Sequence, residues 1–420
     1  MIADLVIRNI KTIYTPFLKP PVKGKDMASI HELHDAYIAC KDGKIIEIAS
    51  GECKKCMGPN TYVYDAQGLI VVPGFIDGHT HLVHGGSREN EYALLQQGVP
   101  YLDILKAGGG ILGTVEKTRL CDEGALYQKA FRSLDEMMSY GVTAVESKSG
   151  YGLSLEHETK QLRVNQRLNR HHPVRMVSTY MGAHAIPKEF LDNKKGYIES
   201  LKEDMKYIKA HDLASSVDVF CETAVFSIEE TKDILTEAKK LGFNIKMHAD
   251  EIDALGGAGL GVDLGCSSVD HLMATSDEDI QKLAASNTIA NLLPGTSFYL
   301  KKGYARARAM IDNGVAVSIS GDYNPGSCPT ENFQFIMHLA SRQLNMLPEE
   351  ILNATTINAA YHLNLHHEIG SLEVGKSADF VILNAPNLAY VFYHFGINHT
   401  KDVFIEGKPV VLDRNIVRSL

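Results

Sequence analysis

The middle of the chain repeats one pattern, in which a helix with an apolar stripe is followed by a short apolar strand. In residues 121–140 apolar side chains recur at three- and four-residue steps, which is the spacing of one helical face. Gly141 suits the left-handed turn that ends a helix, and residues 142–145 form an apolar run of strand length. The same order of stripe, glycine and apolar run returns at 234–247 and 305–319.

Eight such strands are predicted between about residues 71 and 365. They are the run that enters 72–81 and the segments 142–145, 175–180, 217–220, 243–247, 267–269, 288–292 and 315–319. Eight strand-then-helix units predict an α/β fold with a (β/α)₈ TIM-like barrel. Continuous apolar strands fit a parallel sheet that is buried on both faces. An open doubly wound sheet alternates in the same way and is the alternative, but the number of strands favours the barrel.

Both ends of the chain have a different character, with short strands and tight turns. Asp42-Gly43 is a hairpin signal between two strand candidates, and residues 378–383 and 403–411 have the same composition of strands and turns. We therefore expect one discontinuous small β-sandwich domain, built from residues 1–70 and 366–420, beside a catalytic barrel of residues 71–365.

Composition narrows the class of protein. The 420 residues are 45% hydrophobic and 22% charged, with a formal net charge of -9, which argues against nucleic acid or an anionic membrane as the main partner. Seven scattered cysteines imply no disulfide framework and fit a reducing compartment. Cys53 and Cys56 are predicted to lie in a surface turn. Neither a signal peptide nor a membrane-spanning run is visible, so we expect a cytoplasmic protein that acts on a small molecule.

The first candidate chemistry is the pair His79 and His81. On a strand, residues i and i+2 point to the same side, so two imidazoles can be aimed at one point, as a metal ion requires. Two histidines on one strand face can also be merely packed or solvated. The other strand ends decide between these readings, because in a barrel the catalytic groups gather at the carboxyl ends of the strands.

Histidines and carboxylates do follow the later strands. The strand ends with such residues are Glu146–Tyr151, Gly182–His184, Cys221–Glu222, His248–Glu251, Asp270–His271 and Asp322–Ser327, while the seventh strand leads to Pro294–Gly295, which has neither. Imidazole and carboxylate suit a borderline-soft divalent ion. We predict one divalent metal per chain, held by His79, His81, His248 and Asp322. Such an ion would lower the pKa of a bound water, so that hydroxide exists near neutral pH.

Glu251, His271 and Asp322 are the candidate catalytic residues. Glu251, three residues past His248, could pass a proton between the water and the leaving nitrogen, or could simply be a charge at a helix N-terminus. His271 could stabilise the developing oxyanion, or could be a core histidine with satisfied hydrogen bonds. His184 could bind substrate or pack at the rim.

At this point the residues resemble a known family. Pro73–His81 is similar to the first-strand signature of the amidohydrolase superfamily, and Gly370–Asp379 is similar to its return into the β domain. The end of the fourth strand, Cys221–Glu222, offers no lysine that could be carboxylated to bridge two metals. The resemblance therefore implies a member with a single zinc or iron ion, and we expect a homodimer.

Narrower motifs resemble one branch of that superfamily. They are residues 146–153, 182–185, 248–251 and 322–327, with 87–88 and 108–110. The resemblance implies hydrolysis of the ring amide of 4-imidazolone-5-propanoate to N-formimidoyl-L-glutamate, in histidine degradation. A nucleobase deaminase of the same superfamily is the rival, and a non-catalytic barrel scaffold is a distant one.

The same resemblance implies residues that bind the substrate. Arg88 would clamp the propanoate carboxylate, which suits a planar guanidinium. Tyr101, Tyr151 and His184 would orient the ring. Residues of the 322–327 motif would contact the substrate or the opened product. The implied set is Arg88, Tyr101, Tyr151, His184, Glu251, Asn324, Gly326 and Ser327, the last of these at a position where the family more often has threonine.

Overall fold

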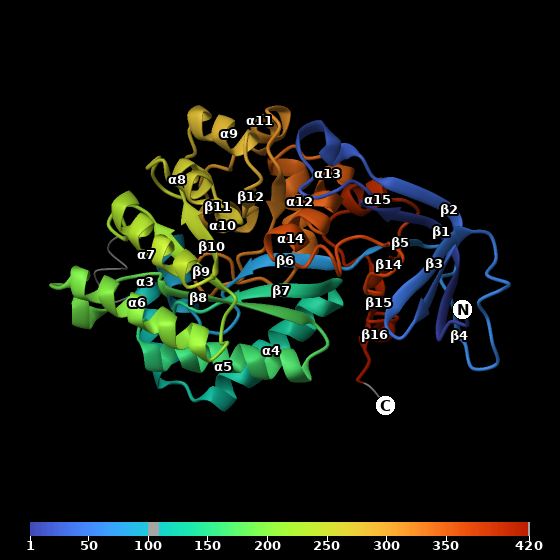
Figure 1. Ribbon diagram of the computed structural model, residues 1–420, viewed down its shortest axis with the longest axis horizontal. Helices are drawn as coiled ribbons and strands as arrows, with labels where there is room; N and C mark the ends of the chain where they lie inside the picture. Colours follow the sequence, from blue (N-terminus) through green and yellow to red (C-terminus); the bar gives the residue numbers. More distant parts are fainter. Residues whose placement is uncertain (100–108, 419–420) are drawn as a thin grey trace.

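The computed structural model describes residues 1–99 and 109–418, and these form a barrel beside a smaller sheet (Figure 1). Among the described residues, no helix is both long enough and apolar enough to cross a membrane. The two sheets share no strand. Both termini lie on the side of the smaller sheet, away from most of the barrel helices (Figure 1).

The barrel contains the eight predicted strands, each hydrogen-bonded in parallel to the next along the chain. They are β6 (Phe75–Thr80), β7 (Val142–Lys148), β8 (Arg175–Ala183), β9 (Ser216–Cys221), β10 (Asn244–Ala249), β11 (Ser268–His271), β12 (Ile289–Leu292) and β13 (Val317–Ile319). The ring closes where the backbone N–H of Asp322 donates to His79 O at 2.9 Å and that of His81 donates to Tyr323 O at 2.8 Å. The prediction of a barrel is confirmed, and closure brings the first and last strand ends together.

Helices surround this barrel, and most follow the predicted alternation with the strands (Figure 1). They are α1 (Glu89–Gln96), α3 (Gly110–Leu120), α4 (Glu123–Ser139), α5 (Leu155–His171), α6 (Lys194–Ala210), α7 (Ile228–Lys240), α8 (Gly257–Leu264), α9 (Asp277–Ala284), α10 (Pro294–Leu300), α11 (Ala307–Asp312), α12 (Phe333–Gln343), α13 (Pro348–Ala354), α14 (Ile357–His362) and α15 (Leu388–Tyr393), with two 3₁₀ turns, η1 (Gly24–Ala28) and η2 (Lys188–Phe190). Helix α4 illustrates how the sequence specifies these helices. The predicted apolar stripe is its buried face, which includes Tyr127, Leu134 and Met138. The side chain of the N-cap residue Asp122 accepts the N–H of Ala125, and Gly141 after the helix has φ +92°.

The smaller sheet joins the two ends of the chain. Its strands are β1 (Leu5–Thr15), β2 (His31–Lys41), β3 (Lys44–Ser50), β4 (Tyr62–Asp65), β5 (Ile70–Pro73), β14 (Phe380–Leu383), β15 (Thr400–Ile405), β16 (Lys408–Leu412) and β17 (Asn415–Ile416). Strand β5 pairs with β1 in parallel and with β14 in antiparallel orientation, so N- and C-terminal strands form one mixed sheet. The predicted hairpin is present: Asp42 and Gly43, with φ of 49° and 76°, turn β2 into β3.

Residues 70–80 are two strands rather than one run. Strand β5 belongs to the smaller sheet and β6 to the barrel, and the chain passes between them at Gly74. A Cβ at position 74 would lie 2.1 Å from Thr143 Oγ1, so only glycine lets the chain approach β7 this closely. The short passage fixes the direction in which β6 delivers its histidines to the barrel rim.

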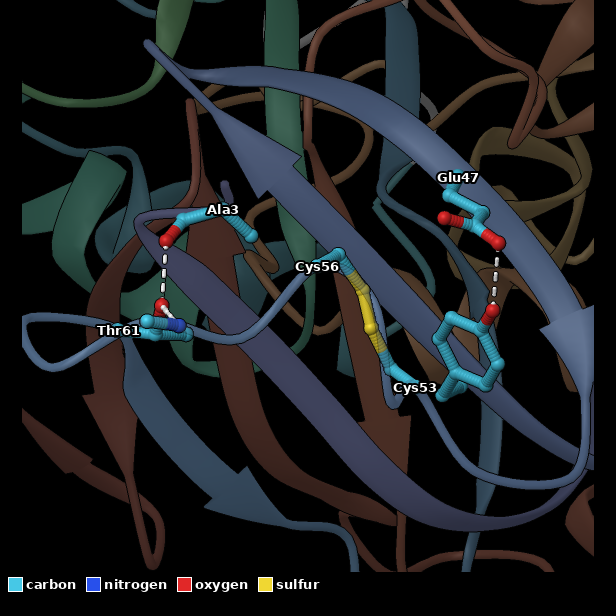
Figure 2. Close-up of a disulfide and its surroundings, with 7 residues drawn as sticks. Ala3, Glu47, Cys53, Cys56 and Thr61 are labelled. Carbon is cyan, nitrogen blue, oxygen red and sulfur yellow. Dashed lines mark hydrogen bonds between the residues drawn. A yellow bond between two sulfur atoms is a disulfide. The ribbon is translucent and has the colours of Figure 1, made fainter. Parts of the chain in front are cut away.

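Cys53 and Cys56 lie in a surface loop in which Lys54 and Lys55 are exposed, but the cysteine side chains themselves are buried and paired, which the sequence did not predict. The structure pairs them in a disulfide, and both side chains are buried in a small apolar cluster with Ala3 and Tyr37 on the outer side of the smaller sheet (Figure 2). The segment folds back because the N–H of Ala3 donates to Cys56 O at 2.8 Å and Thr61 Oγ1 donates to Ala3 O at 2.7 Å. A spacing of three residues brings the two Cα atoms to 6.0 Å, within the range of a disulfide.

Candidate metal centre

Three buried histidines converge at the rim of the barrel. His79 lies near the end of β6, His81 just after it, and His248 near the end of β10, and one ligand nitrogen from each lies within 4.8 Å of the others. Asp322, after β13, places Oδ1 at 3.5 Å from His79 Nε2 and 3.8 Å from His81 Nε2. The structure therefore brings all four predicted ligands together.

The donor set fits a divalent cation. Within the described parts of the chain, the Nε2 atoms of His79 and His248 are buried without a hydrogen-bond partner. Their Nδ1 atoms, in contrast, contact Asp270 at 2.6 Å and Asp218 at 2.9 Å. A carboxylate at Nδ1 holds the proton there and leaves the lone pair on Nε2, which is the arrangement of metal-binding histidines. Buried polar atoms without partners are rare in proteins, and a cation at this point satisfies both.

Electrostatics favour the same role. Burial lowers the pKa values of His79, His81 and His248 well below that of an ordinary imidazole. Neutral rings can offer a lone pair to a cation without first losing a proton. Burial also raises the pKa of Asp322 to about 6. A nearby cation favours the charged form of such a carboxylate.

The backbone of Asp322 is in the left-handed region, with φ +54°, as are those of His271 (+80°) and Asp250 (+50°). These conformations are unfavourable for residues with a Cβ, and they recur at functional sites whose surroundings enforce them. Asp322 is further held by a hydrogen bond from Thr296 Oγ1 to its Oδ2. Thr296 lies in α10 after the seventh strand, and it orients the carboxylate toward the histidines.

His271 and Glu251 lie beside the histidine cluster. The ring of His271 is 5.0 Å from that of His248, and its Nε2 is 3.7 Å from Glu251 Oε2. One ligand atom each from His79, His271 and Asp322 also lie within 4.8 Å of one another. A carboxylate and an imidazole therefore flank the position that the four proposed ligands surround.

The turn that carries Glu251 is held from two sides. Glu222 Oε2 accepts the N–H groups of Ile252 at 2.8 Å and Asp253 at 3.4 Å. Asp250 accepts the N–H groups at the start of α8, at 3.0 and 3.1 Å. Because Asp250 satisfies those helix amides, the carboxylate of Glu251 is not needed as their cap.

An aromatic wall stands next to the cluster. His184 stacks on His81 with ring centroids 4.9 Å apart and an interplanar angle of 13°, and Tyr151 lies 5.3 Å from His184. His184 Nδ1 contacts Gly150 O at 2.9 Å, which fixes its ring. Burial lowers the pKa of His184 to about 4, so the ring is neutral at pH 7. A planar substrate ring could stack against this wall.

Arg88 meets the last predicted motif. A Cβ at position 326 would lie 1.9 Å from Arg88 Nη1, so Gly326 provides the space for the guanidinium. Arg88 Nε and Nη2 donate to Glu91 at 2.8 and 2.6 Å. Asn324 Oδ1 accepts the N–H groups of Gly326 and Ser327, both at 2.8 Å. Tyr101, also predicted to bind substrate, lies outside the described residues.

Several residues of the site were missed by sequence reasoning. Asp218, Asp270, Thr296 and Glu91 each bind a candidate residue, and Glu222 holds the turn that follows Glu251, but none was assigned a role. Asp218 and Asp270 carried a weak signal, because a charged residue inside an otherwise apolar barrel strand needs a buried partner. The other three are recognisable only from their contacts.

Comparison with known proteins agrees with this geometry. A family model described as "Amidohydrolase family" matches residues 70–410. The chain belongs to the amidohydrolase family. Curated relatives named imidazolonepropionase include one from Alkaliphilus metalliredigens, 50% identical over 416 residues (98% of this chain and 99% of that protein), and one from Fusobacterium nucleatum, 49% identical over 411 residues (98% and 99%).

Solved structures share the amidohydrolase fold at low identity. E. coli guanine deaminase superposes with a TM-score of 0.73 at 15% identity, covering 97% of this chain and 98% of that one. A zinc-bound adenosine deaminase from Xanthomonas campestris gives 0.72 at 17% identity, with 99% and 95% covered. These structures confirm the predicted architecture of a barrel with a second, smaller sheet.

Proposed function

We propose that this amidohydrolase is an imidazolonepropionase, which hydrolyses the ring amide C–N bond of 4-imidazolone-5-propanoate to N-formimidoyl-L-glutamate in histidine degradation. One observation carries the proposal: relatives of that name are about half identical over nearly their whole length. The site supports it, because a histidine and carboxylate cluster, an aromatic wall and an arginine lie at one rim of the barrel.

In this proposal His79, His81, His248 and Asp322 hold one divalent ion, zinc or iron. When bound, that ion activates water and polarises the ring carbonyl. Glu251 takes a proton from the water and passes it to the leaving ring nitrogen, and His271 donates to the oxygen on which negative charge develops. Each role uses an atom that already faces the cluster.

Substrate orientation falls to the neighbouring residues. Arg88 binds the propanoate carboxylate, while Tyr101, Tyr151 and His184 orient the ring. Asn324, Gly326 and Ser327 line the end of the site that receives the substrate carboxylate. Asn324 Oδ1 accepts the N–H groups of the other two residues and so fixes the loop beside Arg88.

The substrate assay is direct. Freshly made 4-imidazolone-5-propanoate is incubated with the purified protein, and the loss of its ultraviolet absorbance is followed alongside ammonia release from guanine and cytosine. The proposal requires loss of the imidazolone absorbance without ammonia from either base. Ammonia from a base, with the imidazolone left intact, would instead assign a deaminase.

Replacing Arg88 by alanine is expected to raise KM by about tenfold to a hundredfold, because a charge-assisted hydrogen bond contributes roughly 1.5–3 kcal/mol. The kcat value should change less, since the guanidinium lies with Gly326 rather than with the histidine cluster. Steady-state kinetics of Arg88→Ala and Arg88→Lys measure this. The control is Arg163→Ala, which removes an exposed arginine paired with Glu123; an unchanged KM in Arg88→Ala would refute the clamp.

The finer statements on assembly and location belong to the same proposal. We infer a cytoplasmic homodimer that has no nucleic-acid partner. An exposed apolar segment that begins at the last residue of α15, with Tyr393 80%, Phe395 73% and Ile397 42% exposed, supports an interface between copies. Light scattering should give twice the 46.2 kDa of the chain, and Phe395→Asp should reduce the mass toward one chain. A wild-type chain that is monomeric at micromolar concentration would contradict the dimer.

A further inference from the structure

A fully buried lysine lies inside the barrel, beneath the histidine cluster. Lys148 is the last residue of β7 and is 0% exposed. Its Nζ lies 2.6 Å from Asp218 Oδ2, 3.0 Å from Glu146 Oε2 and 3.6 Å from Asp270 Oδ2. One ammonium group thus bridges carboxylates from three different strands, β7, β9 and β11.

Two of these carboxylates hold the proposed metal ligands. Asp270 Oδ2 contacts His79 Nδ1 at 2.6 Å, and Asp218 Oδ1 contacts His248 Nδ1 at 2.9 Å. Lys148 therefore lies at the centre of two chains of contacts, each running from lysine to aspartate to histidine. The histidines in turn present Nε2 atoms that have no partner within the part of the chain described.

Three carboxylates surround Lys148, and they favour the charged form of this lysine. Burial by itself would lower the pKa of Lys148, but attraction to Asp218, Glu146 and Asp270 outweighs it, and the pKa is raised. A second buried lysine, Lys246 on β10, donates to Glu146 at 2.6 Å and to Gly78 O at 3.3 Å. Lys246 also attracts both aspartates electrostatically, but within 4 Å its ion pair is with Glu146, whereas the Nζ of Lys148 lies within 4 Å of Asp218 and Asp270 as well.

We propose that Lys148 is a positioning residue of the metal centre, which fixes Asp218 and Asp270 together and so aims His79 and His248 at one cation. The inference rests on the proposed metal-dependent function and adds a residue that touches neither the ion nor the substrate. Carboxylates that orient metal-bound histidines usually change metal affinity tenfold to a hundredfold when lost. A single group that holds two of them should act on both ligands at once.

A purely structural role predicts something different. Removing either buried lysine takes a counter-charge away from buried carboxylates and destabilises the fold. If stability alone were involved, Lys148→Met and Lys246→Met would weaken metal binding alike. Under the positioning role, the loss of Lys148 has the larger effect, because it removes the close contacts to both histidine-binding aspartates.

The experiment measures metal affinity without substrate. Wild type, Lys148→Met and Lys246→Met are purified, checked for folding by circular dichroism, stripped of metal, and titrated with Zn²⁺ against a chromophoric chelator. The visible absorption of the Co²⁺-loaded proteins reports ligand geometry in parallel. We expect Lys148→Met to bind Zn²⁺ about 10- to 100-fold more weakly with altered Co²⁺ bands, and Lys246→Met to stay within about threefold of wild type.

Lys148→Gln covers the case in which the methionine variant does not fold. Its amide is one atom shorter and cannot span the carboxylates, so the same weakening is expected. Zn²⁺ affinity within about threefold of wild type in a folded Lys148 variant, or an equal loss in Lys246→Met, would overturn the positioning role. A wild-type chain that binds no Zn²⁺ would instead overturn the metal-dependent function on which the proposal rests.

Discussion

The Glu251→Gln variant is expected to keep its metal, while its kcat should fall by a factor of about 10²–10⁴, the usual contribution of a general acid–base group. Glutamine has nearly the shape of glutamate but cannot accept and return a proton. The carboxylate of Glu251 faces His271, with 3.7 Å between Oε2 and Nε2, while Glu222 holds the backbone of its turn. Kinetics of the metal-loaded variant, with metal content measured on the same sample, test this.

The neighbouring Asp253 provides the control. It is exposed in the same turn, so Asp253→Asn removes an equal charge without touching the cluster. Its kcat should match that of wild type. If Glu251→Gln turned over at the wild-type rate with its metal in place, another group would have to transfer the proton.

Replacing His79 by alanine is expected to abolish stable metal binding, from one ion per chain to nearly none, and activity with it. Two groups of ligand atoms converge at the site, one from His79, His81 and His248 and the other from His79, His271 and Asp322. His79 belongs to both groups. Its Nδ1 is also bound to Asp270, so the variant leaves a buried carboxylate without its partner. Elemental analysis after dialysis measures the loss.

A histidine elsewhere separates metal loss from general damage. His172 is also a buried histidine paired with an aspartate, because its Nε2 contacts Asp135 at 3.2 Å. His172→Ala should cost stability but leave one ion per chain. If His79→Ala retained a full complement of metal, the proposed ligand set would be wrong.

The barrel and its ligands could be predicted because both follow from local patterns. Most of the strands are short apolar runs that lead into polar residues, and parallel strands place those ends at one rim. His79, His81, His248 and Asp322 stand at such ends, so knowledge of the fold was enough to bring them together. Their convergence needed no information about distances.

The supporting contacts could not be predicted in the same way. Asp218 and Thr296 bind site residues on or just after the neighbouring strand, and Asp270 on β11 binds His79 on β6, through side-chain contacts that spacing along the chain does not record. The burial of Cys53 and Cys56 depends on a loop folding back onto Ala3, which no periodicity records. At Gly74 the sequence shows one apolar run, while the structure divides it between two sheets.

Metal-dependent turnover of 4-imidazolone-5-propanoate tests the central claim most directly. The metal-free protein is titrated with Zn²⁺ or, under anaerobic conditions, Fe²⁺, and the rate of absorbance loss is plotted against ions added per chain. We predict a rate near zero without metal that rises linearly and saturates at one ion per chain. Full activity in the metal-free protein, or no hydrolysis at saturation, would contradict the claim.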